Sequence, residues 1–197
     1  MDKKIAAPAR EGLIIPAPLK RGDLVGIVAP SGPTDTELLN MGIEFLRGLG
    51  FNVLAGCNVN AQCGYLAGPD GQRCRDFNAM LREPRVRGVC FARGGYGVMR
   101  ILDAIDIEAV RTDPKILLGM SDITALQLSL FTRAGLVTFA GPMPAGQMAA
   151  GLDSVSAESL VTALTTPVEP RDLFISSPGV RVLRSGKASG VLIGGCL

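Results

Sequence analysis

The sequence predicts an α/β fold in which a parallel sheet carries helices on both faces. Short β-rich runs alternate with segments whose apolar residues recur at helical spacing. The first run, residues 24–29 (LVGIVA), is continuously apolar, as is typical of a strand buried on both faces. The chain has 197 residues, of which 47% are hydrophobic and 19% charged, which is enough for one domain with a substantial core.

The elements follow one another as repeated strand–helix units. Strands are predicted over residues 24–29, 51–54, 86–92, 116–118 and 137–140, and helices over residues 36–49, 72–82, 99–105, 123–133 and 156–164. Asp35 or Thr36 can cap the first helix, Pro84 follows the second, and Gly135 ends the fourth. This order predicts a flavodoxin-like sheet.

Three parts are expected along the chain. Residues 1–18 are predicted to form a flexible N-terminus, residues 19–166 an N-terminal α/β domain, and residues 167–197 a linker followed by the first strand of a truncated, β-rich second domain. That strand, residues 189–193, would present an unpaired apolar edge. A homodimer is one way in which such an edge could be covered.

Composition narrows the class of partner. The formal net charge of +2 is too small to indicate nucleic acid or an anionic membrane, and no apolar run is long enough to span a bilayer. Five cysteines (Cys57, Cys63, Cys74, Cys90 and Cys196) lack C-x-x-C spacing, and the chain has no histidine. We therefore expect a soluble cytoplasmic protein with reduced thiols, no metal, no cofactor and a small-molecule partner.

Glycine- or proline-rich loops follow four of the predicted strands. They read A-P-S-G-P (29–33), R-G-G-Y-G (93–97), G-M-S-D (119–122) and A-G-P-M (140–143). Because the carboxyl ends of parallel strands meet at one edge of a sheet, we expect Ser31, Gly94–Gly97, Ser121 and Gly141 to lie along that edge. Open α/β sheets bind their ligands there.

Ser121 stands where a buried strand turns into a helix, which is the geometry of a nucleophile elbow. The alternative is a plain helix cap, because serine and aspartate are both good N-caps. The R-G-G-Y-G loop offers backbone N–H groups that suit an oxyanion hole or an anion nest, although the motif taken alone favours a tight turn. A phosphate site is a poorer match, because the first loop lacks both the Walker lysine and G-x-G-x-x-G spacing.

The residues supply no evident base for such a serine. The nearest lysine in sequence, Lys115, lies at the far end of the same strand, on the order of 20 Å from Ser121 by strand rise. Arg93 stays protonated, and the side chain of Asp122 points elsewhere in an elbow. If Ser121 is a nucleophile, its base comes from outside these residues.

The motifs together resemble the N-terminal half of the serine-type LD-carboxypeptidase family, which includes the murein tetrapeptide carboxypeptidases and the microcin-immunity peptidases. The resemblance covers residues 19–197 and rests on G-D-L-V-G-I-V-A-P-S-G-P (22–33), R-x-x-D-F-N (73–78), A-R-G-G-Y-G-V-M-R-I-L-D (92–103), P-K-I-L-L-G-M-S-D-I-T-A-L (114–126) and T-F-A-G-P (138–142). Three positions depart from the family pattern: Cys196 stands where asparagine is usual, and Gln127 and Ala140 where histidine is frequent.

The resemblance implies a site and a reaction. Ser121 would be the nucleophile, with the backbone N–H of Gly94 or Gly95 and that of Asp122 forming the oxyanion hole. Ser31, Arg93 and Tyr96 are expected to bind substrate from the same loops. The substrate would be a muropeptide or another small peptide with an L–D bond, cleaved before its terminal D-amino acid. The family takes its triad glutamate and histidine from a C-terminal domain, so this chain alone is expected to be inactive.

Two other functions remain open from the sequence. The chain could be a non-catalytic peptide-binding module or a degenerate gene product, which would hold a peptide without cutting it. It could also be a flavodoxin-like nucleotide binder, although the absence of tryptophan and the scarcity of other aromatic residues disfavour a flavin-stacking site.

Overall fold

The computed structural model describes residues 12–168, 181, 183–186 and 193–195. Within them, five parallel strands form one sheet in the order β2-β1-β3-β4-β5. The strands are β1 (Leu24–Val28), β2 (Asn52–Ala55), β3 (Val86–Phe91), β4 (Ile116–Gly119) and β5 (Phe139–Ala140). This is the flavodoxin-like strand order, so the predicted α/β class is confirmed.

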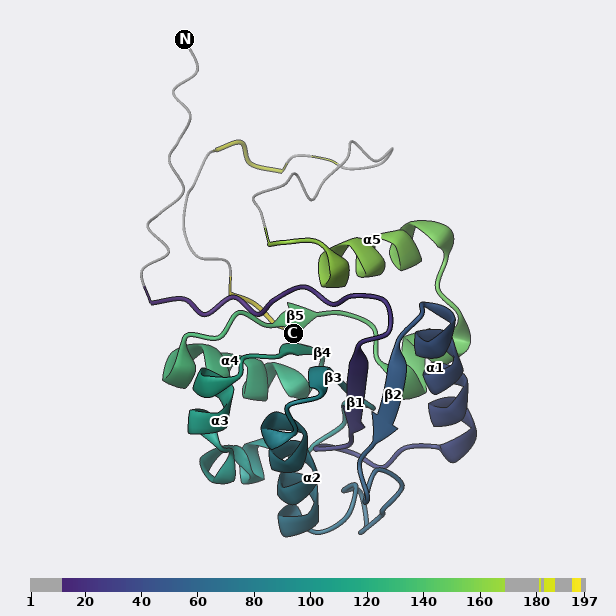
Figure 1. Cartoon of the computed structure of the whole chain (residues 1–197), viewed down its shortest axis with the longest axis vertical. Helices are drawn as coiled ribbons and strands as arrows, with labels where there is room; N and C mark the ends of the chain where they lie inside the picture. Colours follow the sequence, from purple (N-terminus) through teal and green to yellow (C-terminus); the bar gives the residue numbers. More distant parts are fainter. Residues whose placement is uncertain (1–11, 169–180, 182, 187–192, 196–197) are drawn as a thin grey trace.

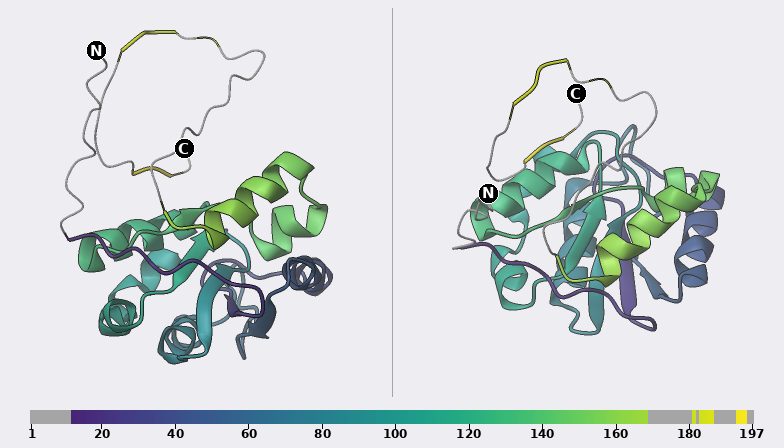
Figure 2. Two further views of the ribbon diagram at one scale, coloured as in Figure 1. Left: turned by 45° about the horizontal axis from the view of Figure 1, so that its top comes forward. Right: turned by 90° about the horizontal axis from the view of Figure 1, so that it is seen from above.

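Helices cover both faces of the sheet. Helix α1 (Thr36–Gly48) lies on one side, and α2 (Asp70–Arg82), α3 (Ile107–Thr112) and α4 (Ile123–Ala134) lie on the other (Figure 1). Helix α5 (Ser154–Thr165) packs over the α1 face (Figure 2). Successive residues of β1 pack into different hydrophobic clusters on the two faces of the sheet. Ile27 packs in the cluster beneath α1 and Val28 in the cluster beneath α2, as expected for a strand buried on both faces.

Helix α1 is closely packed against a later segment of the chain. Its N-terminus is capped by the carboxylate of Asp35, which accepts hydrogen bonds from the backbone N–H groups of residues 37 and 38. Its middle lies on the segment η3 (Pro144–Met148). A Cβ atom at Gly42 would stand only 2.2 Å from the carbonyl oxygen of Pro144, so this packing requires glycine.

The helix predicted over residues 99–105 is wrong. The structure has two single 3₁₀ turns there, η1 (Val98–Arg100) and η2 (Leu102–Ala104), and α3 then starts after Asp106. The side chain of Asn78 donates to the carbonyl oxygen of Ala104 at 2.9 Å and accepts from the N–H of Asp106 at 3.0 Å. These two bonds bracket Ile105, whose extended backbone (φ −74°, ψ 134°) separates η2 from α3 and could not belong to a continuous helix.

Described residues near the end of the N-terminal segment predicted over residues 1–18 contact the folded body. Ile14 forms an isolated parallel bridge with Leu136, its N–H donates to the carbonyl oxygen of Gly135 at 2.8 Å, and Leu19 is buried. Backbone pairing therefore ties the chain to the folded body from residue 14. The strand predicted over residues 189–193 falls outside the described residues, apart from Ile193, and so does most of the region 167–197 that was assigned to a linker and second domain.

Candidate active site

Ser121 lies at the turn from β4 into α4 with a φ of 63°. Among the residues that the structure describes, it is the single non-glycine residue with a left-handed backbone. Such a conformation costs about 1–3 kcal/mol and persists where the surrounding structure enforces it. The helix-cap alternative is not supported, because the N-cap position is Asp122 and no side chain caps the helix. A strained strand-to-helix turn that presents a serine has the geometry of a nucleophile elbow.

The R-G-G-Y-G loop lies directly against this serine. A Cβ atom at Gly94 would be 2.8 Å from Cβ of Ser121, 3.1 Å from its Oγ and 3.6 Å from the backbone nitrogen of Asp122. Gly95 has a φ of 122°, which favours glycine, and its backbone meets that of Gly32 in the loop after β1. The contact between Gly94 and Ser121 leaves no room for a side chain at position 94. Glycine at this position therefore allows the loop after β3 to meet the turn after β4.

Three backbone N–H groups belong to residues at this contact. Within the described part of the chain, the N–H groups of Gly94, Gly95 and Asp122 donate to no backbone or side-chain acceptor. Asp122 also stands at the N-terminus of α4, where the helix dipole favours negative charge. N–H donors grouped beside a hydroxyl oxygen can stabilise an oxyanion that forms when the hydroxyl attacks a carbonyl.

The carboxylate of Asp122 ties three loops together. It accepts a 2.7 Å hydrogen bond from Oγ of Ser31, in the loop after β1, and a 3.0 Å bond from the N–H of Val98, in the loop after β3. Ser31 is fully buried. The structure thus places this predicted substrate contact beneath the site, where its hydroxyl positions Asp122 instead of facing a ligand.

A buried arginine bonds to the loops that follow β1, β2 and β3. The guanidinium of Arg73 donates to the carbonyl oxygens of Gly97 at 3.0 Å, Gly68 at 3.2 Å and Pro30, and it pairs with Asp70. Hydrogen bonding to Arg100, more than to Arg73, lowers the pKa of the Asp70 carboxyl. In the sequence, Arg73 stands out only as part of the R-x-x-D-F-N motif. The sequence does carry one signal for this role: Arg73 lies four residues before Phe77, so both side chains fall on the face of the helix that is predicted to point inward.

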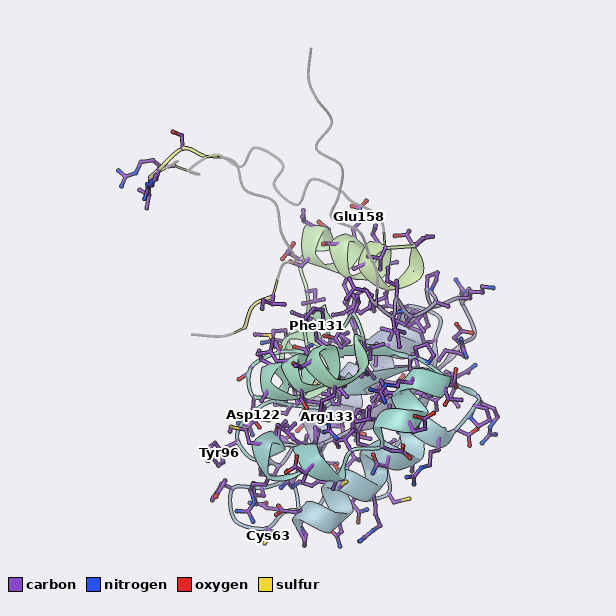
Figure 3. All side chains as sticks on the ribbon, turned by 90° about the vertical axis from the view of Figure 1, so that its left-hand side faces the viewer. Cys63, Tyr96, Asp122, Phe131, Arg133 and Glu158 are labelled. Atoms are coloured by element: carbon purple, nitrogen blue, oxygen red, sulfur yellow. The ribbon has the colours of Figure 1, made fainter. Side chains whose placement is uncertain are left out.

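Arg93 and Tyr96 lie at the rim of the site. Arg93 is exposed, and its Nη1 donates to the carbonyl oxygen of Pro33 at 3.0 Å. Tyr96 is also exposed, and its ring centroid lies 5.8 Å from that of Tyr65. Figure 3 shows Tyr96 projecting outward on the side of the molecule where Asp122 lies. Tyr65, carried by the loop after β2, was not predicted from the sequence as a site residue.

Lys115 is held at the opposite end of β4. Its Nζ donates to the carbonyl oxygens of Glu83 at 3.0 Å and Val86 at 2.7 Å, and it forms an ion pair with Asp113 at 2.6 Å. The side chain is buried. Lys115 is therefore committed to the amino end of the strand and is not the base for Ser121.

A pocket of about 680 Å³ adjoins the elbow along α4. Its lining includes Met120, Thr124, Gln127, Gly141 and the segment 193–195. Gln127 Nε2 donates to the carbonyl oxygens of Gly119 and Phe139, at 3.0 and 2.9 Å, and so joins the ends of β4 and β5. A Cβ atom at Gly195 would lie 2.4 Å from Cγ2 of Thr124. The volume falls in the range of small-ligand sites, and the predominantly apolar lining suits an uncharged part of a ligand.

The residues with described structure contain no group of three or more histidine, cysteine, aspartate or glutamate side chains arranged to hold a metal ion. No helix in the same residues has both the length and the apolar character needed to cross a membrane.

Comparison with known proteins places the chain in a family. The model of the LD-carboxypeptidase N-terminal domain matches residues 25–141. A protein of Streptomyces coelicolor with a provisional carboxypeptidase name is 41% identical over 190 residues, which are 94% of this chain and 60% of that protein. The probable murein peptide carboxypeptidase of Bacillus subtilis is 39% identical over 185 residues, covering 92% of this chain and 57% of the relative.

Solved structures of members of the same family have a similar fold. The microcin C7 self-immunity protein MccF in its apo state superposes with a TM-score of 0.75 at 27% identity, over 88% of this chain and 56% of that one. MccF has also been solved in complex with aspartyl sulfamoyl adenosine, and as an active-site mutant in which a serine, an asparagine and a lysine are replaced by alanine. The chain spans about 60% of the length of the curated relatives described above. Its residues 25–141 constitute an LD-carboxypeptidase N-terminal domain, and the chain belongs to that family.

Proposed function

We propose that this chain supplies the nucleophile of a serine-type LD-carboxypeptidase that hydrolyses murein peptides before their terminal D-amino acid. The observation that carries the proposal is the left-handed Ser121, held against Gly94 beside backbone N–H groups that have no acceptor among the described residues. Family membership and the naming of the Bacillus subtilis relative for murein peptides support the reaction class.

The reaction follows from these positions. Oγ of Ser121 attacks the carbonyl carbon of the last peptide bond, and the carbonyl oxygen becomes an oxyanion that accepts hydrogen bonds from the N–H groups of Gly95 or Gly94 and Asp122. The C–N bond then breaks, the amine of the D-amino acid takes up the proton lost by Ser121, and an acyl-enzyme ester remains. Water hydrolyses the ester and restores the serine.

The 197 residues include no histidine, so we assign the proton carrier to a part of the enzyme outside them. In the family that the sequence resembles, a glutamate and a histidine of the C-terminal domain do this work. Loss of a triad base costs several orders of magnitude in rate, although the oxyanion hole leaves a residual activity. The chain by itself therefore turns over at a very low rate.

Two further parts of the proposal concern substrate and setting. The exposed guanidinium of Arg93 would bind the terminal carboxylate, and Ser31 acts on the reaction by positioning Asp122. Cys57, Cys63, Cys74 and Cys90 carry free thiols, which fits a reducing cytoplasm and the recycling of peptidoglycan fragments there.

The test is chemical rescue with an external base. The chain is incubated with a murein tetrapeptide ending in D-alanine, with and without imidazole, and release of D-alanine is measured. We expect slow release that rises with imidazole and disappears in Ser121→Ala and with a peptide ending in L-alanine. Release that is unchanged in Ser121→Ala would remove Ser121 as nucleophile. Tight peptide binding without any imidazole-dependent release would favour the binding module.

A further inference from the structure

The chain has two tyrosines and no tryptophan, and its two tyrosines stand together at the surface. Tyr65 is 61% exposed and Tyr96 is 60% exposed, with ring centroids 5.8 Å apart and ring planes inclined by 59°. All phenylalanines among the described residues are buried or half-buried. Leaving two large rings in water forgoes the stabilisation that their burial would provide, which points to a ligand for the pair.

The pair is built on the loops that form the candidate active site. Tyr96 follows Gly94 and Gly95, which pack against Ser121 and Gly32. Tyr65 belongs to the loop after β2, where the N–H of Ala67 donates to the carbonyl oxygen of Ser31 at 2.9 Å. The buried guanidinium of Arg73 bonds to both loops, at Gly68 and Gly97. The rings are therefore mounted on a braced backbone at the mouth of the site.

We propose that Tyr65 and Tyr96 bind the pyranose ring at the saccharide end of a muropeptide, an inference that rests on the proposed function. Two rings inclined by 59° cannot both lie flat on one planar base, whereas the thicker pyranose ring offers C–H groups to two inclined faces. The phenolic hydroxyls can donate to and accept from sugar hydroxyls and an N-acetyl group. Arg100, which lies beside Tyr65, adds a polar rim.

The spacing along the substrate agrees with this placement. A tetrapeptide has three residues between its saccharide end and the scissile bond, a span of about 10 Å when extended. The Cα atoms of residues 94 and 96 are at most roughly 7 Å apart, and a tyrosine ring reaches several ångströms further. A peptide whose scissile carbonyl meets Ser121 and whose chain runs toward the 93–97 loop is therefore long enough to bring its sugar to Tyr96 and its partner Tyr65.

The experiment uses the tyrosines as the probe. Because no other tyrosine or tryptophan is present, intrinsic tyrosine fluorescence of the unmodified chain reports on this pair alone. The chain is titrated with N-acetylmuramoyl-tetrapeptide, with the free tetrapeptide and with adenosine, and each affinity is also measured by calorimetry. We expect the muramoyl peptide to change the fluorescence and to bind about tenfold more tightly than the free peptide.

Variants decide whether the rings provide that preference. Tyr65→Ala and Tyr96→Ala should bring the ratio of the two peptide affinities to about one, while Tyr65→Phe keeps most of it. Leu38→Ala, at an exposed position on α1, is the matched control and should keep the ratio of the unmodified chain. Circular dichroism confirms that each variant is folded.

Each other outcome overturns the inference in a distinguishable way. Equal binding of the two peptides would remove the saccharide site and leave the proposed function intact. Tighter binding of adenosine than of the muramoyl peptide would reassign the rings to a nucleoside. Failure of both peptides to bind would instead contradict the proposed function, and the saccharide site with it.

Discussion

The hydroxyl of Ser31 donates a 2.7 Å hydrogen bond to the carboxylate of Asp122, a residue 91 positions further along the chain. The same carboxylate accepts the N–H of Val98 at 3.0 Å. The residue that follows the candidate nucleophile is thereby bonded to the loops after β1 and β3. The position of the elbow depends on this contact as well as on its own strand and helix.

A double-mutant cycle measures this coupling. Asp122→Ala leaves a buried hydroxyl and a backbone N–H without an acceptor and should lower the free energy of unfolding by about 2–3 kcal/mol, whereas Ser31→Ala should cost about 1 kcal/mol. The double variant should lose about 1 kcal/mol less than the sum of the two, as measured in urea. Strict additivity would show that the two side chains do not interact.

The strain at Ser121 predicts an unusual order of stability. Glycine adopts a φ of 63° without the strain that a Cβ atom causes in alanine, so Ser121→Gly should be more stable than Ser121→Ala by about 1 kcal/mol. Ser129, within α4, is the matched control. There the order should reverse, because glycine is about 1 kcal/mol worse than alanine inside a helix. The same order at both positions would mean that the backbone of Ser121 is not strained.

Gly94 should tolerate no side chain. Gly94→Ala places a methyl group 2.8 Å from Cβ of Ser121 and should cost about 1–3 kcal/mol of stability together with peptide binding. Gly48→Ala is the control, because an added Cβ there meets nothing within 4 Å and alanine favours the end of α1. Urea unfolding and calorimetry check both variants. Undiminished peptide binding by Gly94→Ala would contradict the close contact between the loop and the elbow.

Arg73 should not be replaceable by lysine. A single ammonium cannot reproduce the fork that reaches Pro30, Gly68 and Gly97, so Arg73→Lys should lower the free energy of unfolding by about 3 kcal/mol or more. Arg75→Lys, at an exposed position on the same helix, should change it by less than about 0.5 kcal/mol. Similar small effects for both variants would mean that the loops are held by other groups.

Burial should protect two of the thiols from alkylation. Desolvation raises the pKa of Cys90 to about 12 and also raises that of Cys74, so at pH 8 these thiols are almost entirely protonated and unreactive. Cys57 and Cys63 are exposed. Iodoacetamide followed by peptide mass spectrometry should find Cys57 and Cys63 modified in the native protein, and Cys74 and Cys90 modified only in urea. Rapid native labelling of Cys90 would show that its core opens.

The sequence predicted the parts of the site that follow from periodicity and topology. Strand–helix alternation placed Ser121 and Gly94 on neighbouring strand ends, and the structure brings them into contact. Contacts between side chains of distant loops have no such periodic signal. The pairing of Tyr65 with Tyr96 and the burial of Ser31 arise from how three loops pack, and apolar spacing alone could not show that Asn78 interrupts the helix expected at residues 99–105.

The close approach of Gly42 to Pro144 has a consequence for biosynthesis. Helix α1 is complete about a hundred residues before the segment that covers it has been made. At a translation rate of roughly 5–20 residues per second, its apolar face waits on the order of 5–20 s for its partner. During that interval the nascent chain lacks Ala145 and Met148, which share a buried cluster with Leu39 and Leu46 in the finished fold. Chaperone binding to ribosome-bound chains should therefore peak before residue 144 emerges.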